Sequence, residues 1–402
     1  MEKKKNNNSI LLGAALLMAT SAVGPGFLTQ SATFTATYMN QLTIVIILVI
    51  CMDIITQMNV WSIVGVSGKR AQDLANEVLP GLGIVIAGLV AFGGLVFNVG
   101  NVGGVSLALE ALLGIPVTVG CLLGGALAIC IFISKNASAG MDILAKALGA
   151  VIILVAIFVA FSTKPPVGEI AGGLLDIEDP AKLFTPMITI LGGSCGGYIS
   201  YSGAHRLLDA GIHGRENLND IRKGVLMGTG VSGTVRLLMF LATYGVCTVG
   251  GSAVAEAVVA SSNPAAEVFF QALGNLGYKL FAVILLCASM SSVVGAAYTS
   301  VSFLKTLHPA IAKNQKQVTI GFIAVSTCIM AIFGGAAKLL VLAGAVNGLI
   351  LPVSLSVILI AGHKKSIVGD YKHSRVLTVA GCIIAVLTLF FGIKGIGALL
   401  GF

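Results

Sequence analysis

The sequence predicts an all-α, polytopic membrane protein, and three observations carry that prediction. The 402-residue chain is 56% hydrophobic and 10% charged, whereas about a quarter of the residues of a soluble domain are charged. Its 51 glycines suit helices that pack closely in lipid. Runs such as 42–51 and 152–161 are apolar on every side, which is typical of helices in lipid and not of alternating barrel strands. A water-soluble enzyme is therefore excluded.

Apolar stretches of about 20 residues predict about eleven spans. They lie at 10–38, 42–64, 82–112, 116–134, 142–162, 183–205, 224–249, 277–303, 318–334, 338–361 and 376–397. Five regions follow from them: an N-terminal tail at 1–9, a first repeat at 10–163, an extracellular loop at 164–182, a second repeat at 183–361, and a cytoplasmic loop with the last span at 362–402.

The charges predict the orientation in the membrane. The chain has 24 Lys+Arg and 16 Asp+Glu, a net charge of +8, and most of the basic residues fall in alternate loops, such as Lys69, Arg70 and Lys223. Basic loops face the cytoplasm, so we expect a multi-pass protein of a prokaryotic plasma membrane with a cytoplasmic N-terminus. The basic charge is then an orientation signal, and we expect the lipid bilayer and a small-molecule substrate as partners but no nucleic acid.

Two spans carry helix-breaking residues in corresponding places. The first is interrupted at Gly24, Pro25 and Gly26, and the sixth contains Gly192, Gly193, Ser194, Cys195, Gly196 and Gly197. Proline between glycines interrupts the helical hydrogen bonds, so each span is predicted to consist of two half-helices. The breaks lie five spans apart, which indicates an inverted repeat with its substrate site at the midplane. The alternative is that the glycines only permit close helix packing.

Three segments resemble the NRAMP divalent-metal transporters: GPGFLTQSATFTATYMNQL at 24–42, SGKRAQDLANE at 67–77 and ASMSSVVGAA at 288–297. The resemblance extends more weakly over spans one to ten. It implies a LeuT-like fold, in which a five-plus-five inverted repeat with discontinuous helices 1 and 6 is followed by an eleventh helix.

The chain departs from the family at the positions that bind metal and carry protons. The family's Asp-Pro-Gly-Asn is replaced by Gly24, Pro25, Gly26 and Phe27, its Met-Pro-His by Gly196, Gly197 and Tyr198, and its acidic pair in the third helix by Asn98 and Asn101. A divalent cation in low dielectric requires anionic ligands. The sequence therefore predicts no metal site, and we expect no bound cofactor.

The breaks could instead bind a small organic solute. The start of the second half-helix, near Phe27, would present free N–H groups to a carboxylate, and we expect Gly26 to adopt dihedrals that β-branched residues cannot. The predicted substrate-binding residues are Gly24, Gly26, Phe27, Thr29, Gln30, Ser194, Cys195, Gly196, Gly197 and Tyr198. Resemblance to LeuT-like sodium sites implies a coupling-ion site at Val23, Ser291 and Ser292, with a proton as the alternative and His205 as one candidate carrier.

Two charged residues lie within predicted spans, Asp53 in the second and Arg236 in the seventh. A charge at bilayer depth is costly unless it is paired or hydrated. The sequence leaves two interpretations open: an ion pair within the scaffold, or two charges facing separate water-filled vestibules.

The favoured function is an ion-coupled secondary transporter, a symporter, that moves a small carboxylate or amino-acid-like solute by alternating access. The alternative is a divalent-metal transporter for an ion such as magnesium or manganese, and a non-transporting receptor or membrane enzyme is the third hypothesis. The sequence contains no Walker A motif and no H-E-x-x-H motif, and we expect transport driven by an ion gradient without enzymatic activity.

Overall fold

The computed structural model describes residues 2–134, 150–151, 153–175 and 177–400. Within these ranges the chain is helical and contains no strand. Residues 142–149 and 152 of the predicted fifth span lie outside the described residues. The described part of this span is helical, at 150–151 and at Ile153–Ser162. By length and composition, seven helical runs of the described chain could cross a membrane, and three shorter apolar helices accompany them.

Each predicted span corresponds to helix in the described residues. The part of the chain predicted as the first repeat contains α1 (Glu2–Ala22), α2 (Pro25–Tyr38), α3 (Leu42–Ser67), α4 (Ala71–Val78), α5 (Leu82–Leu113) and α6 (Val117–Ile133). The loop that follows the fifth span contains α8 (Val167–Gly172). The rest of the chain contains α9 (Phe184–Cys195), α10 (Ile199–Asp209), α11 (Leu218–Ala260), α12 (Pro264–Leu304), α13 (Pro309–Lys313), α14 (Gln315–Phe333), α15 (Ala336–Ala361), α16 (Lys365–Val368) and α17 (Arg375–Leu400).

The seventh and eighth spans end close to the residues that the sequence predicts. Two helices meet at a kink inside α11, at Gly251 with φ 70°, and inside α12, at Gly274 with φ 61°. These glycines lie next to the predicted span ends at 249 and 277. Residues 250–276 were expected to form a loop, but α11 runs to Ala260 and α12 starts at Pro264, so most of this connection is itself helical. A glycine with positive φ can join two helices in this way.

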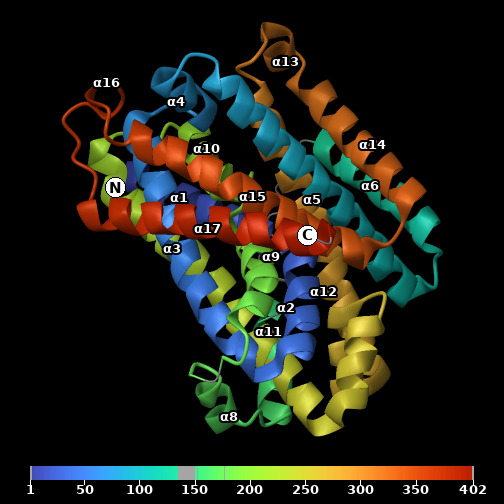
Figure 1. Ribbon diagram of the computed structural model, residues 1–402. Helices are drawn as coiled ribbons and strands as arrows, with labels where there is room; N and C mark the ends of the chain where they lie inside the picture. Colours follow the sequence, from blue (N-terminus) through green and yellow to red (C-terminus); the bar gives the residue numbers. More distant parts are fainter. Residues whose placement is uncertain (1, 135–149, 152, 176, 401–402) are drawn as a thin grey trace.

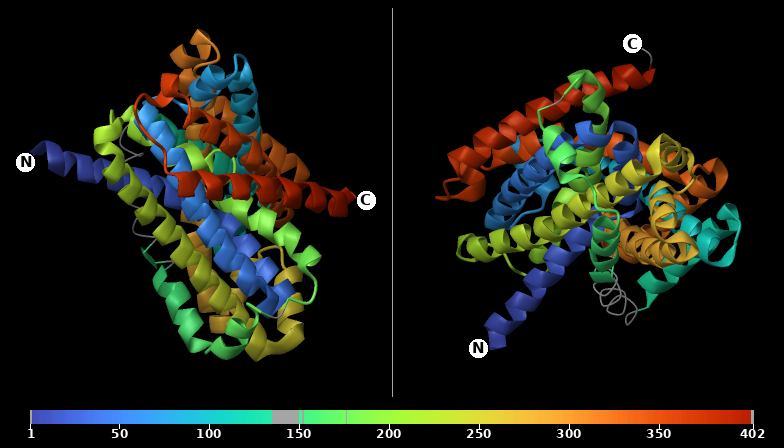
Figure 2. Two further views of the ribbon diagram at one scale, coloured as in Figure 1. Left: turned by 60° about the vertical axis from the view of Figure 1, so that its left-hand side comes forward. Right: turned by 90° about the horizontal axis from the view of Figure 1, so that it is seen from below.

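The two interrupted spans lie inside the helix bundle. The half-helix α2 packs against α11, α12 and α15, and α9 packs against α15 and α3. In Figure 1 the long helix α17 crosses in front of α9, and the two pack against each other. Figure 2 shows α1 and α17 extending from opposite sides of the bundle. The breaks are therefore held by helices from distant parts of the sequence.

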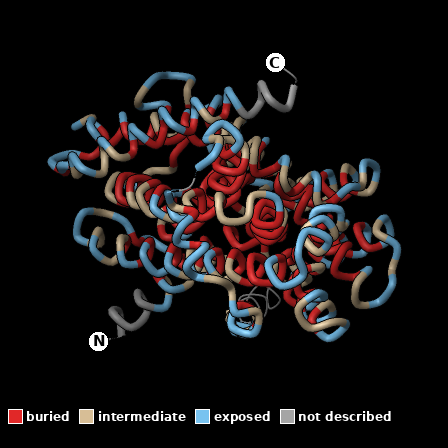
Figure 3. Tube along the Cα trace, turned by 60° about the horizontal axis from the view of Figure 1, so that its bottom comes forward, coloured by how far each residue is buried: buried red, intermediate tan, exposed pale blue. Residues whose placement is uncertain are grey.

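The distribution of exposed side chains fits a protein surrounded by lipid. In Figure 3 the buried residues follow the inner helices, and exposed residues mark the outer turns and connecting loops. Large apolar side chains remain exposed on the outer helices, among them Phe92 at 57%, Ile332 at 77% and Val376 at 77%. An exposed apolar surface of this kind is costly in water and is covered by a bilayer.

Candidate substrate site at the two helix breaks

The first break is confined to Val23 and Gly24. α1 ends at Ala22 and α2 begins at Pro25, with Gly24 in an extended conformation at φ −84° and ψ −179°. Proline fits the first position of a helix because that position has no intrahelical acceptor for an N–H group. Gly26 is already helical, and the expectation that it needs unusual dihedrals was wrong. Proline restarts the helix immediately, so the residue after it has ordinary helical geometry.

Ser292 of α12 lies against this break. A Cβ atom on Gly24 would come within 2.9 Å of the Ser292 Oγ and 3.6 Å of the Asn101 Oδ1. The Ser292 hydroxyl donates to the Thr20 carbonyl at 3.2 Å, whereas the Ser291 hydroxyl donates to Ala288 in its own helix at 2.9 Å. Only one serine of the predicted sodium pair is thus seen to contact the first break, and the sodium site remains a prediction.

The second break is shorter than its glycines suggest. α9 continues to Cys195, and the unwound residues are Gly196, Gly197 and Tyr198. Gly192 and Gly193 are helical, and their missing side chains permit close packing. A Cβ atom would lie 2.1 Å from the Gly344 carbonyl oxygen at Gly192 and 2.4 Å from the Gln30 Oε1 at Gly193. The prediction that unwinding begins at Gly192 was therefore wrong, and Ser194 and Cys195 belong to the end of α9.

The second break depends on the absence of a side chain at Gly197. This residue has φ +53°, and a Cβ atom would lie 1.9 Å from the Asn347 Oδ1. The Asn347 side chain is held in place, since its Nδ2 donates to the Gly93 carbonyl at 3.0 Å and to the Ala343 carbonyl at 2.9 Å. Asn347 was missed in the sequence, although an asparagine in an apolar span is a recognised signal of a functional or packing role.

A buried arginine connects the two interrupted spans. Arg236 of α11 is 2% exposed, and its guanidinium carbon lies 4.4 Å from the centre of the Phe27 ring. The Arg236 Nη2 donates to the Ser194 Oγ, and Nη1 donates to the Ile190 carbonyl at 3.4 Å. One cation therefore contacts the first turn of α2 and the last turns of α9. The sequence left open whether this residue forms a scaffold ion pair or faces a water-filled vestibule, and did not count it among the substrate-binding residues.

Asp53 lies near Arg236 without forming an ion pair. Asp53 of α3 is 5% exposed, and the ion pairs within 4.0 Å among the described residues do not include it. Its Oδ1 has no hydrogen-bond partner, although the Arg236 charge is close enough to attract it. Both interpretations left open by the sequence were incomplete, because the charges are neither paired nor separately exposed.

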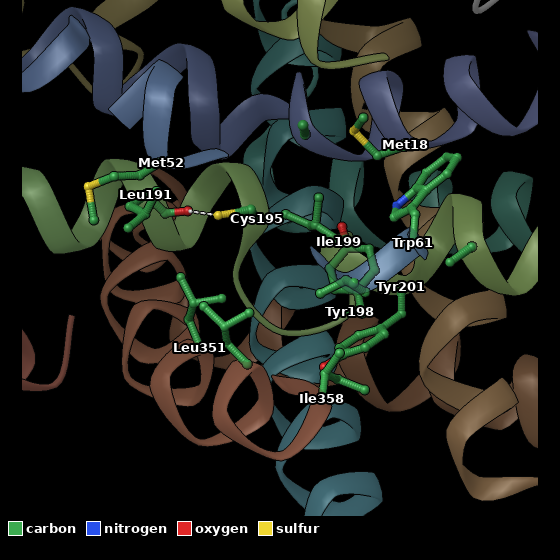
Figure 4. Packing of buried hydrophobic residues seen from close by; sticks show 14 of the residues in the cluster. Met18, Met52, Trp61, Leu191, Cys195, Tyr198, Ile199, Tyr201, Leu351 and Ile358 are labelled. Carbon is green, nitrogen blue, oxygen red and sulfur yellow. Dashed lines mark hydrogen bonds between the residues drawn. The ribbon is translucent and has the colours of Figure 1, made fainter. Parts of the chain in front are cut away.

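The other predicted residues surround the breaks. Gln30 donates from Nε2 to the Leu340 carbonyl at 2.9 Å, and its Oε1 has no hydrogen-bond partner. Tyr198 packs edge-on against Phe97 with ring centres 5.8 Å apart. Figure 4 shows Cys195 and Tyr198 beside α15, with the Cys195 Sγ bonded to the Leu191 carbonyl. Thr29 is buried. These placements bring the predicted residues together without testing what they bind.

The asparagines that stand at the family's acidic positions are buried on α5. Asn98 donates from Nδ2 to the Ser326 Oγ at 2.9 Å. The Asn98 Oδ1 and the Asn101 Nδ2 have no hydrogen-bond partner. Amide groups can bind polar atoms but carry no proton that titrates near neutral pH, so this pair supplies no proton route of the acidic kind.

His205 has a structural use. The Ala71 N–H donates to its Nε2 at 3.3 Å, and its Nδ1 lies 3.0 Å from the Ser302 Oγ. Because Nε2 accepts, the proton of the neutral ring is on Nδ1 and bonds to Ser302. Both ring nitrogens are thus engaged where α4 begins, which makes His205 a poor candidate for proton transport.

Together, two broken helices around a buried polar set define a membrane transporter with a LeuT-like fold. The fold is similar to that of the Eremococcus coleocola manganese transporter, with a TM-score of 0.72 and 16% identity over 96% of this chain and 86% of that chain. It is also similar to MhsT in complex with L-phenylalanine, with a TM-score of 0.62 and 15% identity over 96% of this chain and 98% of that chain.

The family follows from the sequence comparisons. Residues 15–397 match the natural resistance-associated macrophage protein-like family, and the chain belongs to that family. It is 47% identical to the uncharacterized membrane protein YcsG of Bacillus subtilis (strain 168), over 97% of this chain and 95% of that protein. It is 44% identical to an uncharacterized membrane protein of Haemophilus influenzae, over 94% of this chain and 93% of that protein.

Proposed function

We propose that this protein is an ion-coupled secondary transporter that moves a small organic carboxylate by alternating access. The observation that carries the proposal is the buried Arg236 guanidinium, which stacks on Phe27 and bonds to Ser194. Guanidinium groups bind carboxylates through two parallel hydrogen bonds. A cation buried between the two breaks therefore favours an anionic ligand at the same place.

The start of α2 adds donors of the same kind. The first N–H groups of a helix have no intrahelical acceptor, and the Leu28 N–H is already bonded to the Gly24 carbonyl at 3.3 Å. The N–H groups of Gly26 and Phe27 remain, and the positive end of the helix dipole reinforces them. Arginine and helix terminus converge at Phe27, which supports a carboxylate-binding position there.

The divalent-metal alternative meets an electrostatic obstacle at this position. Phe27 stands where the family has an asparagine ligand, and Arg236 lies on its ring. A divalent cation placed here would be repelled by the guanidinium in a low-dielectric environment. Within the part of the chain that the structure describes, no group of three or more His, Cys, Asp or Glu side chains could hold a metal ion. We therefore propose the carboxylate as substrate.

A thermal-shift screen of the purified protein tests this function. The panel consists of small carboxylates, lactams, amino acids and divalent metals, each with and without sodium. A ligand present at 100 times its Kd stabilises the native state by about 2.7 kcal/mol. We expect a carboxylate to raise the unfolding temperature, and we expect proteoliposomes to take up the same compound.

Three variants separate the guanidinium from the overall charge. Arg236→Met should abolish the shift, and Arg236→Lys should retain part of it, because lysine keeps the charge but lacks the planar fork. The matched control is Arg215→Met, which alters an exposed arginine and should behave as wild type. Saturable manganese uptake by the unmodified protein, with no response to any carboxylate, would contradict the proposal.

A further inference from the structure

We propose that Asp53 binds one proton with each carboxylate that the transporter takes up, and this inference rests on the proposed function. The buried carboxylate of Asp53 takes no direct part in the binding of the substrate carboxylate to Arg236. Asp53 is 5% exposed and its Oδ1 has no hydrogen-bond partner. A charged, unpartnered carboxylate oxygen at this depth is costly, and a bound proton would remove that cost.

Few charged or titratable groups face Asp53. Arg236 reaches it from α11 and the Cys195 thiol from α9, while Gln57 lies one turn away on its own helix. The other helices that pack against α3 are α2, α10, α15, α16 and α17, and none of their described residues interacts electrostatically with Asp53. The Cys195 thiol already donates to the Leu191 carbonyl. Arg236 is therefore the main charged group that acts on Asp53, and it opposes the cost of burying the carboxylate.

The charge balance of this pair changes when a carboxylate binds. Without a ligand, one anion at Asp53 offsets one cation at Arg236. A carboxylate on the guanidinium brings a second anion, and two carboxylates that share a buried site cannot both stay ionised at moderate cost. Uptake of one proton restores neutrality. An O–H bond forms at Oδ1 with a proton from the water on the entry side, and the proton leaves to the water on the exit side.

Asp53 is better suited to this step than the other polar residues nearby. Asn98 and Asn101 do not titrate near neutral pH, and both ring nitrogens of His205 are occupied. Glu110, the carboxylate on α5, is exposed near the end of its helix. Once protonated, Asp53 becomes a donor and no longer draws the guanidinium away from the ligand. Proton and carboxylate would thus bind cooperatively.

The variant Asp53→Asn imitates the protonated state and tests the coupling. The probe is the carboxylate that gives the largest thermal shift in a panel that includes the matched pairs L-lactate with L-alanine and L-malate with L-aspartate. Wild-type protein in weakly buffered solution should take up about one proton per bound probe, and above neutral pH the affinity should fall up to tenfold per pH unit. Asp53→Asn should bind the probe without proton uptake and without this pH dependence.

Transport by Asp53→Asn should continue without being coupled to protons. In proteoliposomes the variant should exchange probe across the membrane at a rate near that of wild type, but an inward proton gradient should no longer drive accumulation. The control Asp220→Asn, at an exposed carboxylate near the start of α11, should keep both activities. Asp53→Glu provides a second, charge-conserving variant and should keep proton uptake on binding.

Four results would overturn the inference. The first is accumulation of probe by Asp53→Asn in a proton gradient, and the second is accumulation by wild type in a sodium gradient at constant pH. The third is that folded Asp53→Asn binds no carboxylate. The fourth is that Asp53→Asn loses binding only of L-alanine and L-aspartate, the members of the pairs that carry an ammonium group. The last result would make Asp53 a substrate ammonium ligand. If the wild type binds no carboxylate, the proposed function itself fails; if it binds one without taking up a proton, only the coupling fails.

Discussion

The two breaks each divide a span into half-helices, but they do so by different means. At the first, Gly24 is extended with negative φ and Pro25 begins the next half-helix. At the second, Gly197 has φ +53° and lies directly against Asn347. The first break thus depends on a missing N–H group, whereas the second depends on a missing side chain and on a backbone conformation that favours glycine. The second should therefore be the less tolerant of substitution.

Gly197→Ala should have the largest effect on stability. Alanine at positive φ is strained by about 1–2 kcal/mol, and its Cβ would overlap the Asn347 Oδ1, which adds about 1–3 kcal/mol of overpacking. We expect a large fall in the unfolding temperature of the purified protein. A wild-type unfolding temperature for this variant would show that the second break can rearrange without cost.

A double-mutant cycle separates the two contributions. Asn347→Ala removes the overlapping oxygen together with the bonds to Gly93 and Ala343. In that background Gly197→Ala should cost less, because only the backbone strain remains. The control Gly88→Ala alters a helical glycine of α5 with open space around it and should be close to neutral. Equal costs in both backgrounds would exclude steric overlap as the cause.

The next largest effect is expected from acid, which should weaken the support of the second break. His373 lies just before α17, which packs against α9. The Asn59 Nδ2 donates to the Leu377 carbonyl at 3.0 Å, so its Oδ1 accepts from the His373 Nε2 at 2.8 Å, and the Tyr371 hydroxyl donates to Nδ1 at 3.0 Å. Burial, together with His363 and Arg222, lowers the pKa of His373 to about 4.

The lowered pKa of His373 determines how stability changes with pH. An unfolded histidine binds a proton near pH 6.5 and the folded one does so near 4, so the contribution of His373 to stability is complete above pH 6.5 and is lost as the pH falls toward 4. Between pH 7.5 and 5 the loss should be at most about 2 kcal/mol. The unfolding temperature of wild type should drop more steeply over this range than that of His373→Gln; parallel curves would rule out this histidine as the cause.

Gly24→Ala should have a smaller effect, at the first break. The new Cβ would lie 2.9 Å from the Ser292 Oγ, a hydroxyl that can rotate away at the expense of its bond to Thr20. Loss of such a bond costs about 0.5–1.5 kcal/mol. Ser292→Ala should remove the contact, so Gly24→Ala should cost less in that background when thermal unfolding is measured. If Gly24→Ala destabilises as much as Gly197→Ala, the contrast between the breaks is wrong.

The sequence predicted the existence of both breaks but not their extent. Glycine serves two purposes in the sixth span, since Gly192 and Gly193 permit packing within α9 while Gly196 and Gly197 permit the unwinding that follows it. Nothing in the local sequence distinguishes these uses, because the difference arises from Gln30, Gly344 and Asn347 on other helices. Proline, in contrast, acts through its own backbone. Its position near the start of a half-helix could be predicted, though the exact starting residue could not.

The candidate site shows the same limit. Residues next to the breaks were predicted because the chain itself signals an interruption. Arg236 and Asp53 were recognised as unusual, since charges are costly in spans. The place of Arg236 against Phe27 and Ser194, and of Asp53 near Arg236, depends on how the distant helices α11, α3 and α9 pack. The fold was predictable from pattern and resemblance, whereas the electrostatics of the site required the packing of distant helices.

Gly26→Ala should have the smallest effect on stability. Gly26 is helical, and its Cβ would lie 3.4 Å from a Phe97 ring carbon and 3.5 Å from a Leu340 methyl carbon, so the neighbours need to move by a few tenths of an ångström at most. Alanine is favoured over glycine in a helix by about 0.5–1 kcal/mol, which offsets this crowding. We expect an unfolding temperature near that of wild type.

The same variant separates stability from binding at the first break. The proposed carboxylate approaches the Gly26 N–H, and a methyl group beside that N–H should weaken binding while leaving the fold intact. Thermal unfolding without ligand measures the first effect, and the ligand-induced shift measures the second. A folded Gly26→Ala with wild-type affinity would place the carboxylate elsewhere, since an adjacent methyl group could not then lie in its path. A Gly26→Ala that unfolds as readily as Gly197→Ala would show that the first break also requires glycine at this position, and the two breaks would no longer differ in kind.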